Sequence, residues 1–166
     1  MVRKKREKGI DFIMRRKDRE RGSAFALEVL RDCEYATLAT VNADGSPYCI
    51  PISPVLVDGD TVYFHSATEG QKLDNINNNS AVSISCVRHS IVIPEKFTVE
   101  YESAVVTGAC SVVSDKDEKI LALKKLSEKY AINHMNHFDR EMEKYFHRTC
   151  VCKIDIVQIT GKANIK

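Results

Sequence analysis

The chain has 166 residues, of which 43% are hydrophobic and 29% are charged. This composition is typical of a single soluble globular domain and excludes a disordered or fibrous protein. It contains no apolar run of the roughly 18 residues that a membrane helix needs and no signal-peptide pattern, so we expect a cytoplasmic protein with no membrane partner.

Positive charge is concentrated near the N-terminus. Residues 1–21 contain ten Lys/Arg and four Asp/Glu, whereas the rest of the chain contains 15 Lys/Arg and 19 Asp/Glu. We therefore predict a basic arm over residues 1–21, partly disordered or peripheral, and one domain over residues 22–166. A basic arm can contact nucleic acid, but the body is acidic and has no recognition motif, so we expect no nucleic-acid partner.

The first half of the chain predicts two helices and three strands. They cover Ala24–Asp32 (helix), Tyr35–Val41, Tyr48–Val57 and Thr61–His65 (strands), and Gln71–Asn77 (helix). Ser23 is placed to cap the first helix, because a hydroxyl accepts hydrogen bonds from first-turn amides. Short turns rich in Asp and Gly separate the strands, which favours an antiparallel meander.

The second half predicts three more strands and a third helix. The strands cover Ala81–Val92, Tyr101–Val113 and Val151–Thr160, and the helix runs from a capping-box pattern at Ser114–Asp117 to about Tyr130. Residues 131–148 are polar and rich in His and predict no element. About six strands and three helices, without repeated strand–helix–strand units, favour an antiparallel barrel with flanking helices.

The six cysteines predict free thiols, because they show no Cys-x-x-Cys spacing and the chain has no signal peptide. Cys150 and Cys152 are expected to point to the same side of a strand. They are either small buried core residues or a metal or redox pair. His134 and His137 have a spacing that suits a metal on a helix, but no further ligands are evident, so we expect no metal site.

Two prolines mark the strand Tyr48–Val57. Pro51 and Pro54 each remove a backbone donor, which restricts such a strand to a sheet edge or a bulge. Two interpretations stay open. The strand is an edge protected against aggregation, or its free backbone groups, such as the amide of Ile52, meet a flat polar ligand.

A second pattern suits an anion. His65 and Ser66 end a strand, and a loop containing Gly70 leads to a helix with Lys72 in its first turn. Helix N-terminal amides, a lysine and a hydroxyl together suit a terminal phosphate. The alternative is a solvated lysine beside an ordinary helix. The phosphate loop, Gly-x-Gly-x-x-Gly and the serine nucleophile elbow are all absent.

Five motifs occur in order along the chain. They are Met14–Glu20; Ala39-Thr40-Val41 with Gly45, Pro47-Tyr48 and Pro51; Tyr63-Phe64-His65-Ser66-Ala67 with Gly70 and Lys72-Leu73; Tyr101-Glu102-Ser103; and Ile159–Lys162. With these motifs the chain resembles the pyridoxamine 5′-phosphate oxidase-like flavoproteins, and among them the nitroimidazole-resistance (Nim-type) proteins. The resemblance spans about residues 14–162.

The resemblance implies an antiparallel split β-barrel that forms a homodimer and binds FMN in clefts between the subunits. His65 would lie beside the flavin and donate a proton to the reduced substrate. The implied cofactor-binding residues are Ile50, Pro51, Ile52 and Ser53 along the flavin ring, His65 and Ser66 near it, Lys72 at the phosphate, and Tyr101, Glu102 and Ser103, which reach the cleft from the partner subunit or from the same one.

The function implied is an FMN-dependent oxidoreductase that passes electrons from a reduced nicotinamide or another donor to a small organic acceptor, with a nitroaromatic as one candidate. A non-catalytic flavin carrier or sensor, and a haem- or deazaflavin-binding barrel, remain alternatives. The segments His89–Val99 and 131–148 are expected to shape the substrate pocket. Because the chain lacks Trp, aromatic contacts with a flavin are expected from Tyr48, Tyr101, Phe138 or Tyr145.

Overall fold

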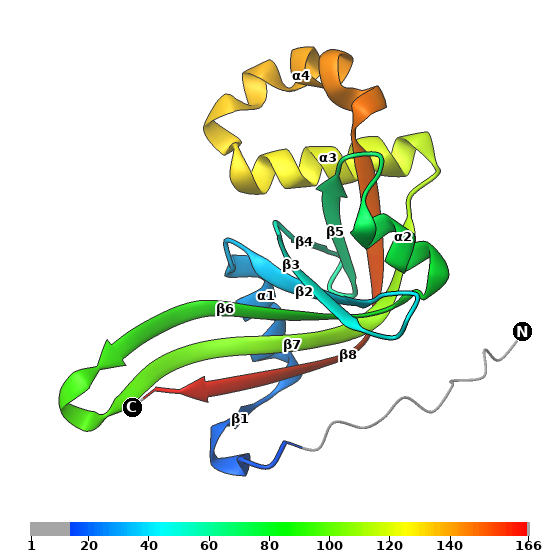
Figure 1. Ribbon diagram of the computed structural model, residues 1–166. Helices are drawn as coiled ribbons and strands as arrows, with labels where there is room; N and C mark the ends of the chain where they lie inside the picture. The colour runs from blue at the N-terminus through cyan, green and yellow to red at the C-terminus, as the bar shows by residue number, and fades with distance from the viewer. Residues whose placement is uncertain (1–13, 166) are drawn as a thin grey trace, which may run out of the picture.

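The computed structural model describes residues 14–165, so residues 1–13 of the predicted arm lie outside the described residues. Within this range one antiparallel sheet of eight strands is accompanied by four α-helices and four short 3-10 helices (Figure 1). The strands are β1 (Glu20–Arg21), β2 (Ala36–Val41), β3 (Pro47–Ile52), β4 (Val55–Val57), β5 (Thr61–Ser66), β6 (Ala81–Ile93), β7 (Thr98–Val112) and β8 (Cys150–Asn164).

The helices cluster at the sheet ends and faces. They are α1 (Ser23–Asp32), α2 (Gln71–Asn78), α3 (Lys116–Tyr130) and α4 (Phe138–Tyr145), with 3-10 turns η1 (Lys17–Arg19), η2 (Pro94–Lys96), η3 (Ile132–His137) and η4 (Phe146–Arg148). In the part of the chain that the structure describes, none of these helices combines the length and the apolar character that a membrane crossing requires.

The sheet is a split barrel, as predicted. Its strands follow the order β3-β2-β6-β7-β8-β5-β4, with β1 paired to β8. The two end strands, β3 and β4, are separated in sequence by only Ser53 and Pro54. So short a link makes the sheet curl until its two ends approach each other. Because β3 pairs with β2 and β4 pairs with β5, the barrel stays open between them.

The predicted strand Tyr48–Val57 is wrong as a single element. It is two strands, because the chain leaves one sheet end at Ser53 and joins the other at Val55. The split and the short strand β1 raise the number of strands from the expected six to eight. Pro51 lies on an edge strand, which confirms that part of the prediction.

The predicted meander is also only partly right. Local hairpins join β2 to β3, β4 to β5, and β6 to β7. The pairings of β2 with β6 and of β5 with β8, however, link strands that are far apart in sequence. Non-local pairing of this kind leaves no mark in turn residues, so the sequence pattern did not predict it.

The end of the predicted arm joins the sheet. Glu20 and Arg21 form β1, which pairs with Lys162 and Gly161 of β8. Gly161 lies where α1 comes close to β8: a Cβ at this position would lie 2.9 Å from the Phe25 ring. The sequence needs glycine here because there is no room for a side chain.

The core has two parts. The larger lies between α1, α2 and the inner face of the sheet, and its largest fully buried side chains include Leu30, Leu38, Phe64, Ile84 and Ile154. The smaller lies under α3, where Val55, Tyr63, Val113, Ala122, Leu126 and Val151 pack together. Successive residues of β5 therefore face different cores, as strand geometry requires.

The helix caps differ from the predicted ones. Helix α1 begins at Ser23 itself, Gly22 is its N-cap, and no side chain caps it, so the predicted Ser23 cap is wrong. Helix α3 is capped by Asp115, whose Oδ1 accepts a hydrogen bond from the Glu118 amide at 2.8 Å. The N-cap is therefore Asp115, one residue after the Ser114 with which the predicted capping box begins, and Glu118 Oε1 accepts a hydrogen bond from the Tyr63 hydroxyl.

Replacing Asp115 with alanine is expected to lower the free energy of unfolding by about 1 kcal/mol, because first-turn amides of α3 lose their acceptor. Urea unfolding followed by circular dichroism measures the change. Ser114→Ala is the matched control, since Ser114 precedes the cap, and it should leave the unfolding midpoint almost unchanged. Equal losses in the two variants would contradict the assignment of the cap.

Candidate functional site

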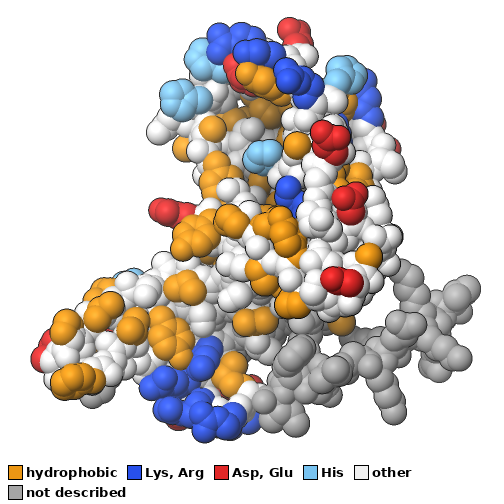
Figure 2. All heavy atoms as spheres, viewed as in Figure 1, with side chains coloured by type: hydrophobic (Ala, Val, Ile, Leu, Met, Phe, Trp, Pro, Cys, Tyr) orange, Lys and Arg blue, Asp and Glu red, His pale blue; other side chains and the backbone are white. Residues whose placement is uncertain are grey.

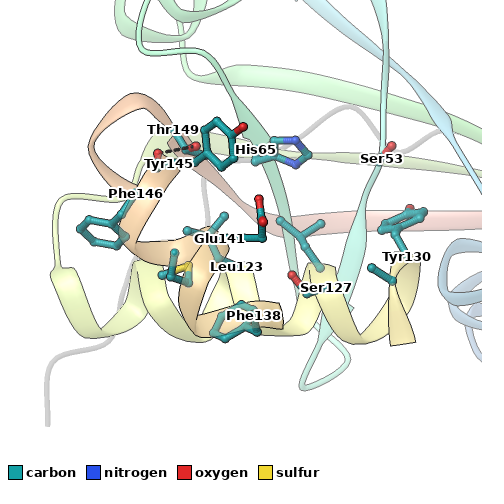
Figure 3. A pocket seen from close by; sticks show the side chains of 13 residues that line it. Ser53, His65, Leu123, Ser127, Tyr130, Phe138, Glu141, Tyr145, Phe146 and Thr149 are labelled. Atoms are coloured by element: carbon teal, nitrogen blue, oxygen red, sulfur yellow. Dashed lines mark hydrogen bonds between the residues drawn. The ribbon is translucent and has the colours of Figure 1, made fainter. Parts of the chain in front are cut away.

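A cavity of about 440 Å³ lies between the barrel, α3 and the segment 138–149 (Figure 3). Ser53 and His65 reach it from the barrel, and Leu123, Leu126 and Ser127 reach it from α3. Its volume lies within the range of about 300–1,000 Å³ that is typical of small-molecule sites.

The wall of the cavity contains several aromatic side chains and one carboxylate. Four rings line it, those of Tyr130, Phe138, Tyr145 and Phe146, together with Glu141 from α4. Glu141 is the one Asp, Glu, Lys or Arg side chain among the described residues that line it. Figure 3 shows its carboxylate directed inward, with Tyr145, His65 and Ser127 around it.

The link between β3 and β4 is tied to α3. The Pro54 carbonyl accepts hydrogen bonds from Lys129 Nζ and from the Tyr130 hydroxyl, each at 2.8 Å. Burial lowers the pKa of Lys129 and raises the pKa of Tyr130. The end of α3 thus holds Ser53, the neighbour of Pro54, at the edge of the cavity.

His65 and Ser66 point to opposite faces of β5. His65 is exposed and lines the cavity, whereas Ser66 is 8% exposed and turned toward the barrel interior. The Ser66 Oγ is the one buried side-chain polar atom without a hydrogen-bond partner among the described residues. A buried hydroxyl without a partner is costly, so this atom indicates a ligand.

Lys72 lies in the first turn of α2, which begins four residues after Ser66 with Gly70 as its N-cap. The lysine is half-buried, and no carboxylate of residues 14–165 lies within ion-pair distance of its ammonium group. Burial raises the pKa of Cys150 to about 11, and Lys72 opposes this rise. Cys150 is the strand partner of Ser66, so their side chains lie on the same face of the sheet.

Ile50, Pro51 and Ile52 lie on the edge strand β3. Ile52 is buried, Ile50 is half-buried against the core, and Pro51 is exposed. Since β3 pairs only with β2 in the described structure, its other side is open at the split of the barrel. This position agrees with both interpretations above, an edge protected against aggregation and free backbone groups that meet a ligand.

The structure does not bring Tyr101, Glu102 and Ser103 to the cavity within one chain. They lie near the start of β7, in the arm of β6 and β7 that projects from the barrel (Figure 1). Glu102 bonds to Arg88 at 2.7 Å, and the Ser103 hydroxyl donates to the Lys162 carbonyl at 3.3 Å. Any contact of these residues with the cavity requires a second copy of the chain.

The cysteines and paired histidines form no metal centre in residues 14–165, where no group of three or more His, Cys, Asp or Glu could hold a metal ion. All six cysteines are free, as predicted. Cys152 is buried in the core and Cys150 packs against the same cluster. The His134 and His137 rings are stacked with centroids 6.4 Å apart.

Several cavity residues were missed by the sequence analysis. Phe138 and Tyr145 were expected near a flavin and line the cavity, whereas Tyr48 and Tyr101 do not. Tyr130, Glu141 and Phe146 were not predicted. The spacing of Phe138, Met142 and Phe146 by four residues is a helical signal that could have revealed α4 in the segment left unassigned.

Comparison with known proteins agrees with this fold. Residues 23–163 match the family of pyridoxamine 5′-phosphate oxidase. The chain therefore belongs to the pyridoxamine 5′-phosphate oxidase family, as its sequence motifs predicted. A comparison with curated proteins gave no match.

Three solved structures are similar in fold. A candidate 5-nitroimidazole antibiotic resistance protein from Bacteroides thetaiotaomicron is 21% identical, with 92% of this chain and 86% of that chain covered and a TM-score of 0.71. A FAD-binding protein from Mesorhizobium loti is 20% identical, with 89% and 98% covered and a TM-score of 0.66. A FAD and heme binding protein from Mycobacterium smegmatis is 22% identical, with 86% and 70% covered and a TM-score of 0.68.

Proposed function

We propose that this protein binds FMN and transfers electrons from a reduced nicotinamide or another donor to a small organic acceptor. The observation that carries the proposal is the set of anion-binding groups at the start of α2. These groups are the buried Ser66 hydroxyl, which has no hydrogen-bond partner among the described residues, Lys72, which has no ion pair among them, and the first-turn amides of α2. Membership of a family with flavin-binding structural relatives supports a flavin as the ligand.

The residues present fit a flavin monophosphate. Lys72, the Ser66 hydroxyl and the helix amides suit one terminal phosphate. Ser53 and His65 line the cavity, which lies on the face of β5 opposite to the Ser66 side chain. The open side of β3, Ser53 and His65 would hold the flavin ring.

A bound flavin supplies the electron transfer, and the protein supplies binding, orientation and protons. The aromatic walls of the cavity hold the acceptor and exclude water. His65 has an imidazole at the cavity surface and donates a proton to the reduced acceptor. Nothing in this scheme requires a nucleophilic side chain.

We further propose a homodimer. Val87, Ile91, Val92, Phe97 and Val99 are exposed on the arm of β6 and β7, and Phe97 at its tip is 98% exposed. Figure 2 shows hydrophobic side chains gathered on this arm. A second copy would cover this apolar surface and carry its own Tyr101–Ser103 segment toward the cleft.

The visible absorption spectrum of the purified protein tests the cofactor, together with mass spectrometry of the compound that heat releases. A flavin spectrum and the mass of FMN are expected. The mass of FAD would overturn FMN but keep the flavin. A haem band, or a colourless protein that takes up no added FMN, would overturn the proposal.

A further inference from the structure

We infer that the cavity recognises a small acceptor with an aromatic body and a protonated amine, and that Glu141 is the residue that recognises the amine. The inference rests on the proposed function for its reaction. The predicted binding of the amine depends only on the residues that line the cavity. The observations are the charge of the cavity, the free oxygen of Glu141 and the nature of the walls.

The first observation concerns the carboxylate. Arg140 bonds to Glu141, but both of its contacts, at 3.1 and 3.3 Å, reach Oε1. The other oxygen, Oε2, accepts no hydrogen bond from the described residues. Arg140 lines a separate hollow of about 260 Å³, not this cavity, and its side chain is 68% exposed. Glu141 lines both this hollow and the cavity, its side chain is 48% exposed, and its Oε2 is the acceptor left for a ligand.

The second observation concerns the rings. The chain's own ammonium groups already lie over three of them. Lys119 is 4.1 Å from the Phe146 centroid, Lys129 is 5.1 Å from that of Tyr130, and Lys144 is 4.7 Å from that of Tyr145. One face of each of these three rings is therefore already taken by a lysine, and among the described residues no cation lies over the fourth ring, Phe138.

These lysines do not compete for the carboxylate inside the cavity. None of the three lines it. The ammonium of Lys119 donates to the Phe146 carbonyl and that of Lys129 donates to the Pro54 carbonyl, each at 2.8 Å. A cationic ligand would therefore find one free carboxylate oxygen and aromatic surface around it.

The alternatives fit less well. An anionic acceptor would place like charge beside Glu141 in a partly enclosed site. A neutral acceptor without a donor would cover part of the carboxylate and replace water at Oε2 without offering it a hydrogen bond. An aromatic amine satisfies both the carboxylate and the rings.

The test compares two probes of nearly equal shape, 4-nitrobenzylamine and 4-nitrobenzyl alcohol, by isothermal titration calorimetry at pH 7 and low salt. The full chain is used as purified and again after incubation with FMN. We expect the wild-type protein to bind the amine about tenfold more tightly or better than the alcohol, as one charge-assisted contact allows.

Glu141→Gln should abolish this preference while leaving the affinity for the alcohol unchanged. The matched control is Glu143→Gln, because Glu143 is exposed on the same helix and does not line the cavity. It should keep the wild-type preference. Circular dichroism shows whether each variant is folded, and both sites are exposed enough to tolerate a change of this size.

The outcomes separate this inference from the proposed function. A colourless protein that takes up no added FMN but shows a Glu141-dependent preference for the amine overturns the flavin and keeps the cavity assignment. A flavin-bearing protein without that preference overturns the assignment alone. Failure of both probes to bind at millimolar concentration, or an equal loss in Glu143→Gln, also overturns it.

Discussion

Replacing Lys72 with alanine is expected to weaken FMN binding by about 10- to 100-fold, the range that a charge-assisted hydrogen bond supports. The side chain is half-buried, has no acidic partner among the described residues and lies in the first turn of α2, six residues after Ser66 with its unpartnered hydroxyl. Riboflavin, which lacks the phosphate, should bind the variant and the wild type equally. Quenching of flavin fluorescence on titration with protein measures both affinities.

The control for this experiment is Lys96→Ala. Lys96 is exposed in the turn η2, at the tip of the arm formed by β6 and β7. This turn is far from α2 in the chain and in the fold (Figure 1). The Lys96→Ala variant should bind FMN like the wild type. Equal weakening for FMN and riboflavin in Lys72→Ala would show that the lysine supports the fold of the site and not the phosphate. Unchanged FMN affinity would reject its role altogether.

Replacing His65 with alanine is expected to slow turnover by about 100-fold or more, the contribution typical of a general acid, while flavin stays bound. His65 lines the cavity from the end of β5 and is exposed, so its loss leaves the buried core intact. Stopped-flow measurement separates the two half-reactions. Reduction of the flavin should keep its rate, and its reoxidation by the acceptor should slow.

His134→Ala provides the comparison, because His134 is exposed in η3 and does not line the cavity. It should leave both half-reactions unchanged. If His65→Ala slows flavin reduction and reoxidation alike, the histidine positions the cofactor and donates no proton. If neither rate changes, His65 is only part of the wall.

Much of the fold could be predicted because local chemistry specified it. The alternation of apolar and polar residues through Ala81–Val92 and Val151–Thr160 predicted β6 and β8, and both strands are present. Pro51 predicted an edge strand because a proline cannot donate to a neighbouring strand. The order of motifs predicted the family, which the match over residues 23–163 confirms.

The sequence predicted separate parts of the candidate site but not how they are arranged in space. The strand end at His65–Ser66 and the helix start at Lys72 are local features, so the sequence showed both. Their arrangement depends on strand geometry in the folded sheet. Two neighbours on β5 face opposite sides, and this places the anion-binding groups and the cavity histidine on either side of one strand.

By itself, the sequence determined most of the strands, most helix limits and the residues that suit a phosphate, since each depends on neighbours along the chain. Only the tertiary structure decided that β2 pairs with β6 and that β5 pairs with β8, because those pairings join segments that are distant in sequence. It alone also decided the cavity, since residues 131–148 show little local signal and acquire their role by packing over α3. That packing directs Glu141 toward His65, which no spacing in the sequence could indicate.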